Sequence, residues 1–393
     1  MNKLPRVLMF VPQYPYPVLG GLEKQSHLLS KALMTQGLVV QVISGKINPG
    51  QPDNELVEGV PVTRLFWSGL KPLRFALAPF SIAKQLWAKS STFDVIHLHQ
   101  CSWVGLFVIV LAKLLGKPIL TKLASVGYGG LPGMRRKVFG WLRLAIFSKS
   151  DAIVAMSAES LQELMAVSYP VARVLLTPNG IDLNDPPPLR LQAGAAPCRV
   201  VFVGRLTQEK NINVLLKAWA RVIAAGVENV TLTLYGDGPL LGALQHQCAE
   251  LDLIGNVIFA GLVENIKDRL PGMDVFVLPS SVEGNSNAIL EAMRAGLPIV
   301  STMAGGTPML VGEEGRAFLS APGDIDALYM HLLILIKNRS LRLTSGLAMR
   351  RRVEQHFDIM QVAQTYSKAY GFLAARERDR ISEVANPVIL NEV

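Results

Sequence analysis

The strongest constraint on the fold of this chain is an alternation of short apolar, β-branched runs with longer helical stretches, which occurs twice. In the first half, strands are predicted at 6–11, 39–44, 95–99, 119–123 and 152–155, with helices at 23–36, 80–89 and 104–115. In the second half, strands are predicted at 199–203, 231–235, 257–260, 275–278 and 299–301, with helices at 214–224, 240–250 and 288–295. Such alternation is typical of parallel sheets covered by helices on both faces.

A proline triplet followed by small residues interrupts the alternation at 184–197 and has the composition of a linker. The chain of 393 residues has room for two domains. We therefore expect an α/β protein with a Rossmann-like doubly wound domain over 1–183 and a second one from 198 onward. In this arrangement the two domains face each other across a cleft. Ligands of such sheets bind at the carboxyl ends of the strands. The charged tail from 376 to 393 shows little periodicity and is expected to be flexible.

The positive charge is concentrated in one region. Of the formal net charge of +9, the segment 71–149 carries 12 Lys and Arg against a single acid, Asp94. No nucleic-acid-binding signature accompanies these residues, so a nucleic-acid partner is not expected. Within 134–149, basic residues alternate with aromatic and aliphatic ones. This pattern suits a helix on an anionic bilayer, but also an ordinary surface helix whose apolar side faces the core.

Other features exclude several classes of protein. The three cysteines lie far apart, so they form neither a disulfide framework nor a CxxC metal site. The apolar run 7–11 is too short for a secretory signal, and 104–112 is too short for a membrane span. No GxGxxG follows either first strand, which disfavours an NAD-dependent oxidoreductase. The expected location is cytoplasmic, with a peripheral position on the cytoplasmic face of the inner membrane as the alternative.

Residues suited to phosphate binding follow several predicted strands. Gly20 and Gly21 precede the first helix, where backbone N–H groups can approach an anion, although such a pair is more often a simple turn. Arg205 and Lys210 stand on the loop after the first strand of the second half. They can converge on a diphosphate, although a solvated basic loop is the commoner case.

The segment 279–298 is the most informative. Asn285, Ser286 or Asn287 can cap a helix whose free N–H groups face a phosphate. Glu291, one turn inside this helix, can accept hydrogen bonds from a ribose, and Glu283 in the preceding loop can reach sugar hydroxyls. Alternatively, both are solvated carboxylates.

Histidines and acids elsewhere do not predict a metal site. His97 and His99 alternate onto one face at the end of a strand, and no further ligands stand nearby. We expect one of them to be buried and hydrogen-bonded and the other to face the cleft. Asp324 and Asp326 are interpreted as a helix N-cap and a first-turn acid.

Taken together, these residues resemble the family 4 glycosyltransferases, which are retaining, metal-independent enzymes with the two-Rossmann GT-B fold. Six stretches carry the resemblance, in family order: Gly20-Gly-Leu-Glu23, Asp94-Val-Ile-His-Leu-His99, Pro178-Asn-Gly-Ile-Asp182, Phe202-Val-Gly-Arg-Leu-Thr-Gln-Glu-Lys210, Tyr235-Gly-Asp-Gly-Pro239 and Glu283…Glu291. The segment 122–130 departs from the family pattern in a region that contacts the acceptor, so the acceptor is left open.

The resemblance implies a role for each matching residue. Arg205 and Lys210 would hold the donor diphosphate in place of a metal. Glu291 would bind the ribose, and Glu283, with backbone N–H groups of 285–287, would hold the hexose. The remaining roles are phosphate contact by Gly20 and Gly21, base contact by Gly261 and Leu262, and a position near the reaction centre for His99. The second domain would then span 198–356, and the segment 357–375 would be a helix that crosses back to the first.

The function so implied is retaining transfer of a hexose from a nucleotide sugar, most simply a UDP-sugar, without a cofactor. The acceptor would be a lipid-linked, cell-envelope or exopolysaccharide glycan, and anionic membrane is a further candidate partner. Two alternatives stay open: a GT-B fold sugar-nucleotide epimerase, and a non-catalytic sugar-nucleotide-binding scaffold of polysaccharide assembly.

Overall fold

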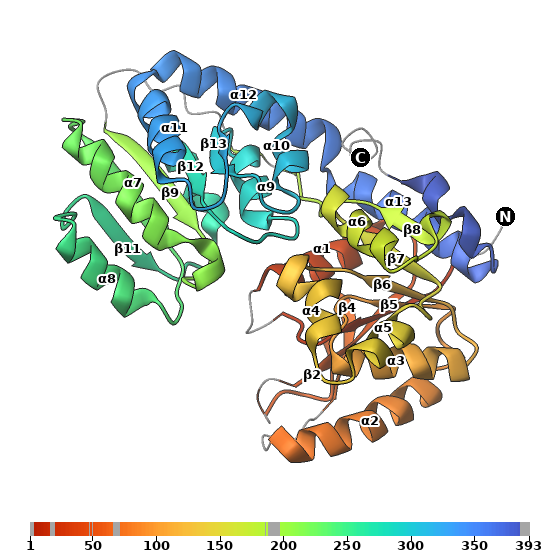
Figure 1. Ribbon diagram of the computed structural model, residues 1–393. Helices are drawn as coiled ribbons and strands as arrows, with labels where there is room; N and C mark the ends of the chain where they lie inside the picture. Colours follow the sequence, from red (N-terminus) through yellow and green to blue (C-terminus); the bar gives the residue numbers. More distant parts are fainter. Residues whose placement is uncertain are drawn as a thin grey trace. The chain divides into compact units, whose positions relative to one another are not determined.

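The computed structural model describes residues 4–15, 20–46, 48, 50–65, 71–184, 186–187 and 197–385, with the backbone alone for 71–77 (Figure 1). The chain forms two compact units. The first comprises Met1–Asp182 and Ile359–Val393, and the second comprises Leu183–Asp358. Each unit is built around its own sheet, so each is described by itself.

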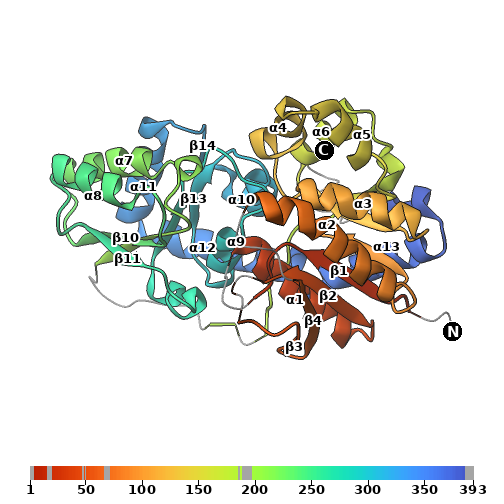
Figure 2. The ribbon, with the colours of Figure 1, turned by 90° about the horizontal axis from the view of Figure 1, so that it is seen from below.

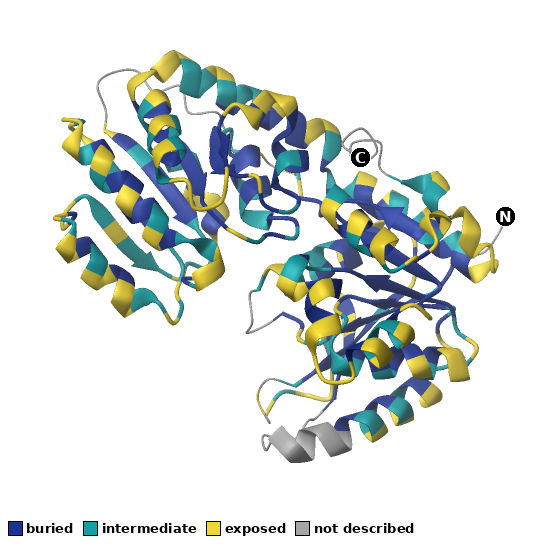
Figure 3. Ribbon diagram, in the orientation of Figure 1, coloured by how far each residue is buried: buried dark blue, intermediate teal, exposed yellow. Residues whose placement is uncertain are grey.

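The first unit contains an eight-stranded sheet in the order β3-β4-β2-β1-β5-β6-β7-β8. All neighbouring strands are parallel except β3 and β4. The strands are β1 (Val7–Val11), β2 (Val40–Gly45), β3 (Asn54–Val57), β4 (Val60–Leu65), β5 (Val95–Leu98), β6 (Ile119–Lys122), β7 (Ala152–Ala155) and β8 (Val174–Leu176). Every residue of β1, β5, β6 and β7 is buried, as expected for strands covered on both faces (Figure 3).

Helices cover both faces of this sheet. They are α1 (Gly21–Thr35), α2 (Lys71–Ala88), α3 (Trp103–Leu114), α4 (Leu131–Arg136), α5 (Gly140–Phe147), α6 (Ala158–Ala166) and α13 (Ile359–Ala374), with short 3₁₀ turns η1 (Gly127–Gly129), η2 (Val171–Arg173) and η6 (Arg378–Val384). Helices α1 and α13 pack together, whereas α2 packs on α3 and α3 on α5 along the opposite face (Figure 2). Of the helices described, none combines the length and apolarity that a bilayer crossing requires.

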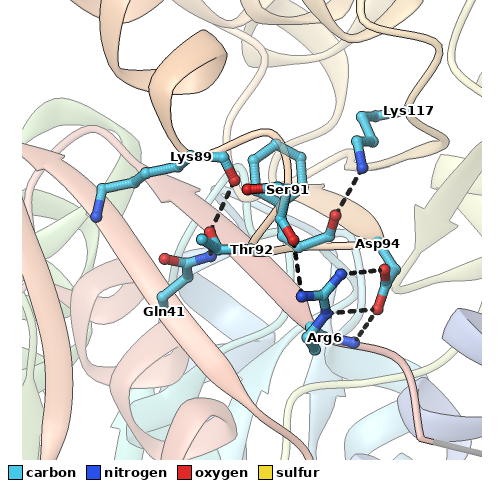
Figure 4. Close-up of polar contacts among 8 residues, drawn as sticks. Arg6, Gln41, Lys89, Ser91, Thr92, Asp94 and Lys117 are labelled. Atoms are coloured by element: carbon cyan, nitrogen blue, oxygen red, sulfur yellow. Dashed lines mark hydrogen bonds and ion pairs between the residues drawn. The ribbon is translucent and has the colours of Figure 1, made fainter.

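An ion pair joins the amino ends of β1 and β5 (Figure 4). The backbone N–H, Nε and Nη2 of Arg6 donate to the Asp94 carboxylate at 2.8–3.1 Å, and Nη1 donates to the Ser91 carbonyl. The Arg6 hydrogen bond is the main cause that lowers the pKa of Asp94 to about 2. Lys117 adds a bond to the Phe93 carbonyl at 2.8 Å. In the family-like stretch 94–99, the first residue, Asp94, therefore joins the amino ends of β1 and β5, and the last residue, His99, lies at the carboxyl end of β5.

The second unit contains a six-stranded, wholly parallel sheet in the order β11-β10-β9-β12-β13-β14. Its strands are β9 (Cys198–Val203), β10 (Val230–Tyr235), β11 (Val257–Gly261), β12 (Val275–Leu278), β13 (Ile299–Thr302) and β14 (Leu319–Ser320). Its helices are α7 (Ile212–Ala224), α8 (Leu241–Glu250), α9 (Asn287–Arg294), α10 (Thr307–Arg316), α11 (Ile325–Lys337) and α12 (Arg339–His356), with 3₁₀ turns η3 (Gln208–Lys210), η4 (Ile266–Asp268) and η5 (Leu270–Gly272).

The predicted fold class of two parallel-sheet α/β units is confirmed, and the predicted strands lie within a residue or two of the observed ones. The interpretation of Asp324 is also confirmed, because its Oδ1 accepts a hydrogen bond from the Ala327 N–H at 2.9 Å. The β3–β4 hairpin was missed. Its two-residue turn, Glu58-Gly59, has positive φ at both positions, and an acid–glycine pair between apolar runs is a recognisable hairpin signal.

One prediction about local structure is wrong. The stretch 134–149 is not one helix: α4 ends at Arg136, and α5 begins at Gly140 after Phe139, whose φ of 54° lies in the left-handed region. The structure describes the tail, which was expected to be flexible, as far as residue 385. Its 3₁₀ turn η6 buries Ile381, and Arg378 contacts Asp151 at 3.4 Å. The remainder of the predicted flexible tail lies outside the described residues.

Candidate active site

In the second unit, loops at the carboxyl edge of the sheet are tied to one another by backbone hydrogen bonds. The loop after β9 joins the loop after β10 through Leu206 N–H to Asp237 O at 2.9 Å. It also joins the loop after β12 through Ser281 N–H to Glu209 O at 2.8 Å. Predicted site residues from different parts of the sequence are therefore held on neighbouring loops of one edge.

The central contact of this edge is an ion pair between Lys210 and Glu283. Lys210 Nζ lies 2.5 Å from Glu283 Oε1, and the same oxygen accepts a hydrogen bond from Ser280 Oγ at 2.7 Å. The Glu283 side chain is buried, and within the described residues its Oε2 has no hydrogen-bond partner. Lys210 likewise keeps two of its three N–H donors for another group. The predicted phosphate-binding and sugar-binding residues are thus in direct contact.

The glycine at 305 allows a second loop to approach Glu283 closely. Gly305 has φ +52°, and a Cβ at this position would lie 1.7 Å from the Glu283 carbonyl oxygen. The next residue, Gly306, donates its N–H to Gly284 O at 2.9 Å. The backbone at Glu283 and Gly284 is therefore packed against the loop that follows β13.

Arg205 follows β9 on the same loop as Lys210 and is exposed, and its side chain makes no hydrogen bond or ion pair to the residues that the structure describes. Glu209 stands between the two cations. Partial burial opposes its ionisation, but a hydrogen bond from Thr207 Oγ1 at 2.7 Å and the charges of Lys210 and Arg205 hold its pKa below the ordinary value. The loop therefore carries a positive field in which an anion is stabilised.

The helix after Glu283 is capped by Ser286, one of the three candidates that the sequence offered. Its Oγ accepts the N–H of Ile289 at 3.5 Å, a long cap, and Asn287 is the first residue of α9. Asn285 is buried, and Glu291 lies one turn inside the helix and is partly buried. The first N–H groups of α9 begin four residues after Glu283, which places a partial positive charge beside the ion pair.

The predicted base-binding residues lie at the end of β11. Gly261 accepts the N–H of Gly236 through its carbonyl oxygen at 2.8 Å, and Leu262 is exposed. This edge strand is joined to β10, so both residues belong to the same carboxyl edge as Arg205, three strands from Glu283.

In the first unit, Gly20 and Gly21 begin α1. Gly20 is the N-cap residue and, as a glycine, has no side chain that could accept a hydrogen bond from the first turn. Burial raises the pKa of Glu23 in this turn. Residues 16–19 of the predicted glycine loop lie outside the described residues. The predicted helix start is thus present.

His97 and His99 lie on one face, as alternation predicts, with their rings stacked at a centroid distance of 4.0 Å. His97 Nδ1 is 2.7 Å from the Tyr370 hydroxyl of α13. Both rings are buried, and His97 is the buried, hydrogen-bonded histidine that the sequence predicts. Burial is the largest cause that lowers both pKa values well below the ordinary histidine value, so both imidazoles are neutral. Neither ring nitrogen of His99 has a partner among the described residues.

Sequence reasoning gave no role to Lys122, which ends β6 beside these histidines. Its Nζ donates to Asn179 Oδ1 at 2.8 Å, and burial lowers its pKa to about 8. Its charge contributes to the low pKa values of His97 and His99. Asn179 belongs to the family-like stretch 178–182, where Gly180 O also accepts from Gln25 Nε2 and Ile181 O from the Ile359 N–H. This stretch therefore connects β6, α1 and α13.

The two parallel-sheet units, with cations and a carboxylate on the carboxyl edge of the second, define a glycosyltransferase of the GT-B type. The structure is similar to that of sucrose-phosphate synthase from Thermosynechococcus elongatus, with a TM-score of 0.78 and 21% identity, over 94% of this chain and 100% of that one. The family model for Glycosyltransferase Family 4 matches residues 19–185, and the model for Glycosyl transferases group 1 matches 197–338. The chain belongs to the family 4 glycosyltransferases.

Two curated relatives match nearly all of the chain. A glycogen synthase of Mycobacterium tuberculosis is 26% identical, over 98% of this chain and 98% of its own length. A UDP-Gal:α-D-GlcNAc-diphosphoundecaprenol α-1,3-galactosyltransferase of Escherichia coli is 24% identical, over 87% of this chain and 94% of its own length. The relatives thus include enzymes that are named for quite different acceptors.

Proposed function

We propose that this glycosyltransferase transfers a hexose, with retention of anomeric configuration, from a UDP-sugar to a lipid-linked or cell-envelope glycan. The observation that carries the proposal is the contact between Lys210 Nζ and Glu283 Oε1 on adjoining loops of the second unit. It joins a cation suited to the leaving diphosphate with a carboxylate suited to the transferred sugar. The Escherichia coli relative, named for UDP-galactose and a diphosphoundecaprenol acceptor, supports this choice of donor and acceptor.

The proposed donor site uses the charges of one sheet edge. As the glycosidic bond breaks, negative charge builds on the departing UDP, and Lys210, Arg205 and the first N–H groups of α9 stabilise it. Because Lys210 and the N–H groups of α9 are held in place before the reaction, they cost no reorganisation when the charge appears. A metal is not required for this role, since the two cations supply the compensating charge.

Glu283 and Glu291 would bind the two sugars of the donor. Glu283 Oε2 is available to accept from a hexose hydroxyl, while Oε1 stays on Lys210 and Ser280. Glu291 on α9 would accept from the ribose diol, with Gly261 and Leu262 against the base. The family resemblance would further assign His99 a position near the reaction centre and Gly20 and Gly21 a contact with the phosphates.

The reaction follows from these assignments. The acceptor hydroxyl attacks the anomeric carbon from the side of the leaving group, the bond to UDP breaks, and the leaving phosphate takes the hydroxyl proton. Retention then needs no covalent enzyme intermediate. The proposed location is the cytoplasm, where nucleotide sugars are made.

The experiment begins with a thermal-shift screen of UDP-, GDP- and ADP-sugars on the full chain. The best binder is then incubated with a polyprenyl-diphosphate-linked sugar, and the anomeric configuration of the product is determined by NMR. An α-linked product from an α-linked donor is expected. Conversion of the nucleotide sugar without an acceptor would instead favour an epimerase, and binding without any turnover would favour a scaffold.

A further inference from the structure

The corner between α4 and α5, defined here as residues 134–143, exposes apolar side chains that an ordinary surface helix would bury. Val138, Phe139 and Trp141 are 75%, 68% and 72% exposed, and Leu142 is exposed as well. Met134, at the start of the corner, and Phe147, beyond it at the end of α5, are buried in the way that a core-facing helix predicts. The apolar residues of this segment are therefore divided between the core and the outer surface.

The corner holds these side chains in a fixed conformation. Phe139 adopts a left-handed conformation, which is unfavourable for a bulky residue and persists only where the surroundings enforce it. Gly140 touches α4 so closely that a Cβ would lie 2.0 Å from the Arg135 carbonyl oxygen. Arg143 Nε donates to the Val138 carbonyl at 2.9 Å. At the start of α4, the Leu131 N–H donates to the carboxylate of Glu163 on α6 at 2.9 Å.

Cations flank the exposed rings in the sequence. The side chains of Arg135, Arg136 and Lys137 are exposed and make no ion pair or hydrogen bond in the described part of the chain. Between Asp94 and Asp151 the sequence contains no Asp or Glu. The side chains of these three cations are therefore not ion-paired within the described residues, and Glu163 of α6, the acid at the start of α4, is hydrogen-bonded to the N–H groups of Gly127 and Leu131.

Neighbouring helices of the same layer continue this composition. On α2, Phe80, Lys84 and Trp87 are exposed at positions that share one helical face. On α3, which packs between α2 and α5, Leu114 is exposed, whereas the charge of the neighbouring Lys113 is paired with Asp151 at 2.6 Å (Figure 2). The corner is thus the most strongly apolar and cationic part of a wider helical surface of the first unit.

We propose that the α4–α5 corner docks on an anionic lipid bilayer, with Phe139, Trp141 and Leu142 at the acyl boundary and Arg135, Arg136 and Lys137 among the headgroups. Rings that reach the acyl boundary beside unpaired cations match the two components of an anionic leaflet. A soluble polyanion would satisfy the cations alone and would leave the apolar side chains in water. This inference deepens the proposed function by naming the partner that brings a lipid-linked acceptor to the first unit.

The test measures binding of the full chain to vesicles of phosphatidylcholine alone and of phosphatidylcholine with about one third phosphatidylglycerol. Binding is expected only to the anionic vesicles, with a blue shift of tryptophan fluorescence that Trp141→Phe removes. Each cation near an anionic leaflet is worth roughly fivefold in partitioning, so Arg135→Gln/Arg136→Gln/Lys137→Gln should weaken binding about a hundredfold. Phe139→Ser/Trp141→Ser should weaken it on the order of tenfold while leaving the salt dependence in place.

Matched controls carry the same changes elsewhere. Lys217→Gln/Arg339→Gln/Arg351→Gln removes the same charge from exposed positions of the second unit, and Ile254→Ser removes an exposed apolar side chain there. Both should bind like the unchanged protein. Equal binding to neutral and anionic vesicles, no binding to either, or self-association abolished by Phe139→Ser/Trp141→Ser would each overturn the proposal. Since vesicle binding requires neither donor nor turnover, this failure is distinct from a failure of the proposed transfer reaction.

Discussion

Replacing Lys122 by methionine is expected to stabilise the first unit at neutral pH. The Lys122 side chain is 7% exposed, and its Nζ donates to Asn179 Oδ1 at 2.8 Å. Burial lowers its pKa from the ordinary value of 10.5 to about 8. Each pKa unit corresponds to about 1.4 kcal/mol, so burying this charge costs roughly 3 kcal/mol at pH 7.

The substitution also removes a hydrogen bond. Leaving the Asn179 oxygen with one donor fewer costs about 1–2 kcal/mol. Subtracted from the roughly 3 kcal/mol that burial of the charge costs, this leaves a net increase of roughly 1–2 kcal/mol in the free energy of unfolding. Methionine keeps the length and most of the volume of the lysine chain, which limits the packing cost. For a unit of about 200 residues such a gain raises the midpoint of thermal unfolding by roughly 3–6 °C.

The pH dependence provides a sharper test than the midpoint at one pH. Below pH 8 both the folded and the unfolded chain carry the Lys122 charge, so the full penalty applies. Between pH 8 and 10.5 the folded state releases the proton while the unfolded state retains it, so the stability of the unchanged protein rises with pH. The advantage of Lys122→Met should therefore shrink across this window and disappear, or reverse by the cost of the lost hydrogen bond, near pH 10.5.

The assay is urea unfolding of both proteins from pH 6.5 to 10.5, followed by circular dichroism and by tryptophan fluorescence. Lys149→Met, at an exposed position, is the control and should show no such window. If Lys122→Met is less stable at pH 7, or if its difference from the unchanged protein is constant from pH 7 to 10, the reasoning from burial is refuted.

Further outcomes concern the donor site and the sheet edges. Lys210→Ala should lower kcat about 10²–10³-fold with the fold intact, whereas the exposed Lys217→Ala should not; equal turnover in both variants would remove Lys210 from the donor site. Gly305→Ala places a Cβ 1.7 Å from the Glu283 carbonyl oxygen, so the free energy of unfolding of the second unit should fall by roughly 2–4 kcal/mol. Urea denaturation measures this change, and an unchanged free energy would contradict the close approach. Asp94→Asn should cost about 1 kcal/mol above pH 4, after allowance for solvent screening of a partly exposed pair. Because the folded pKa of Asp94 is depressed, this difference should fade as the pH falls toward 2, which acid titration of both proteins would show.

Much of the candidate site could be located from the sequence because each piece follows a predicted strand. Arg205 and Lys210 come after β9, and Glu283 comes after β12, so the rule for parallel sheets places all three on one edge. The cap of α9 was narrowed to three residues, and Ser286 proved to be the N-cap. The order of strands and loops in the sequence did not predict which side-chain atoms contact each other, such as Lys210 Nζ and Glu283 Oε1.

The helix break at Phe139 shows the limit of periodicity. Both α4 and α5 have helical composition, and no proline separates them. The break depends on the close approach of Gly140 to the Arg135 carbonyl, a contact that only the folded corner contains. Similarly, the burial of His97 depends on the stacked His99 and on Tyr366 of α13, from the far end of the chain.

The sequence by itself determined the two parallel sheets, their helices and the edge on which the charged residues gather, because apolar periodicity acts over neighbouring residues. Tertiary structure alone decided that Lys210 contacts Glu283, that Lys122 meets Asn179, and that the Tyr370 hydroxyl contacts His97. These partners are 73, 57 and 273 residues apart. Contacts over such separations depend on strand order and helix placement, which no local pattern of residues encodes.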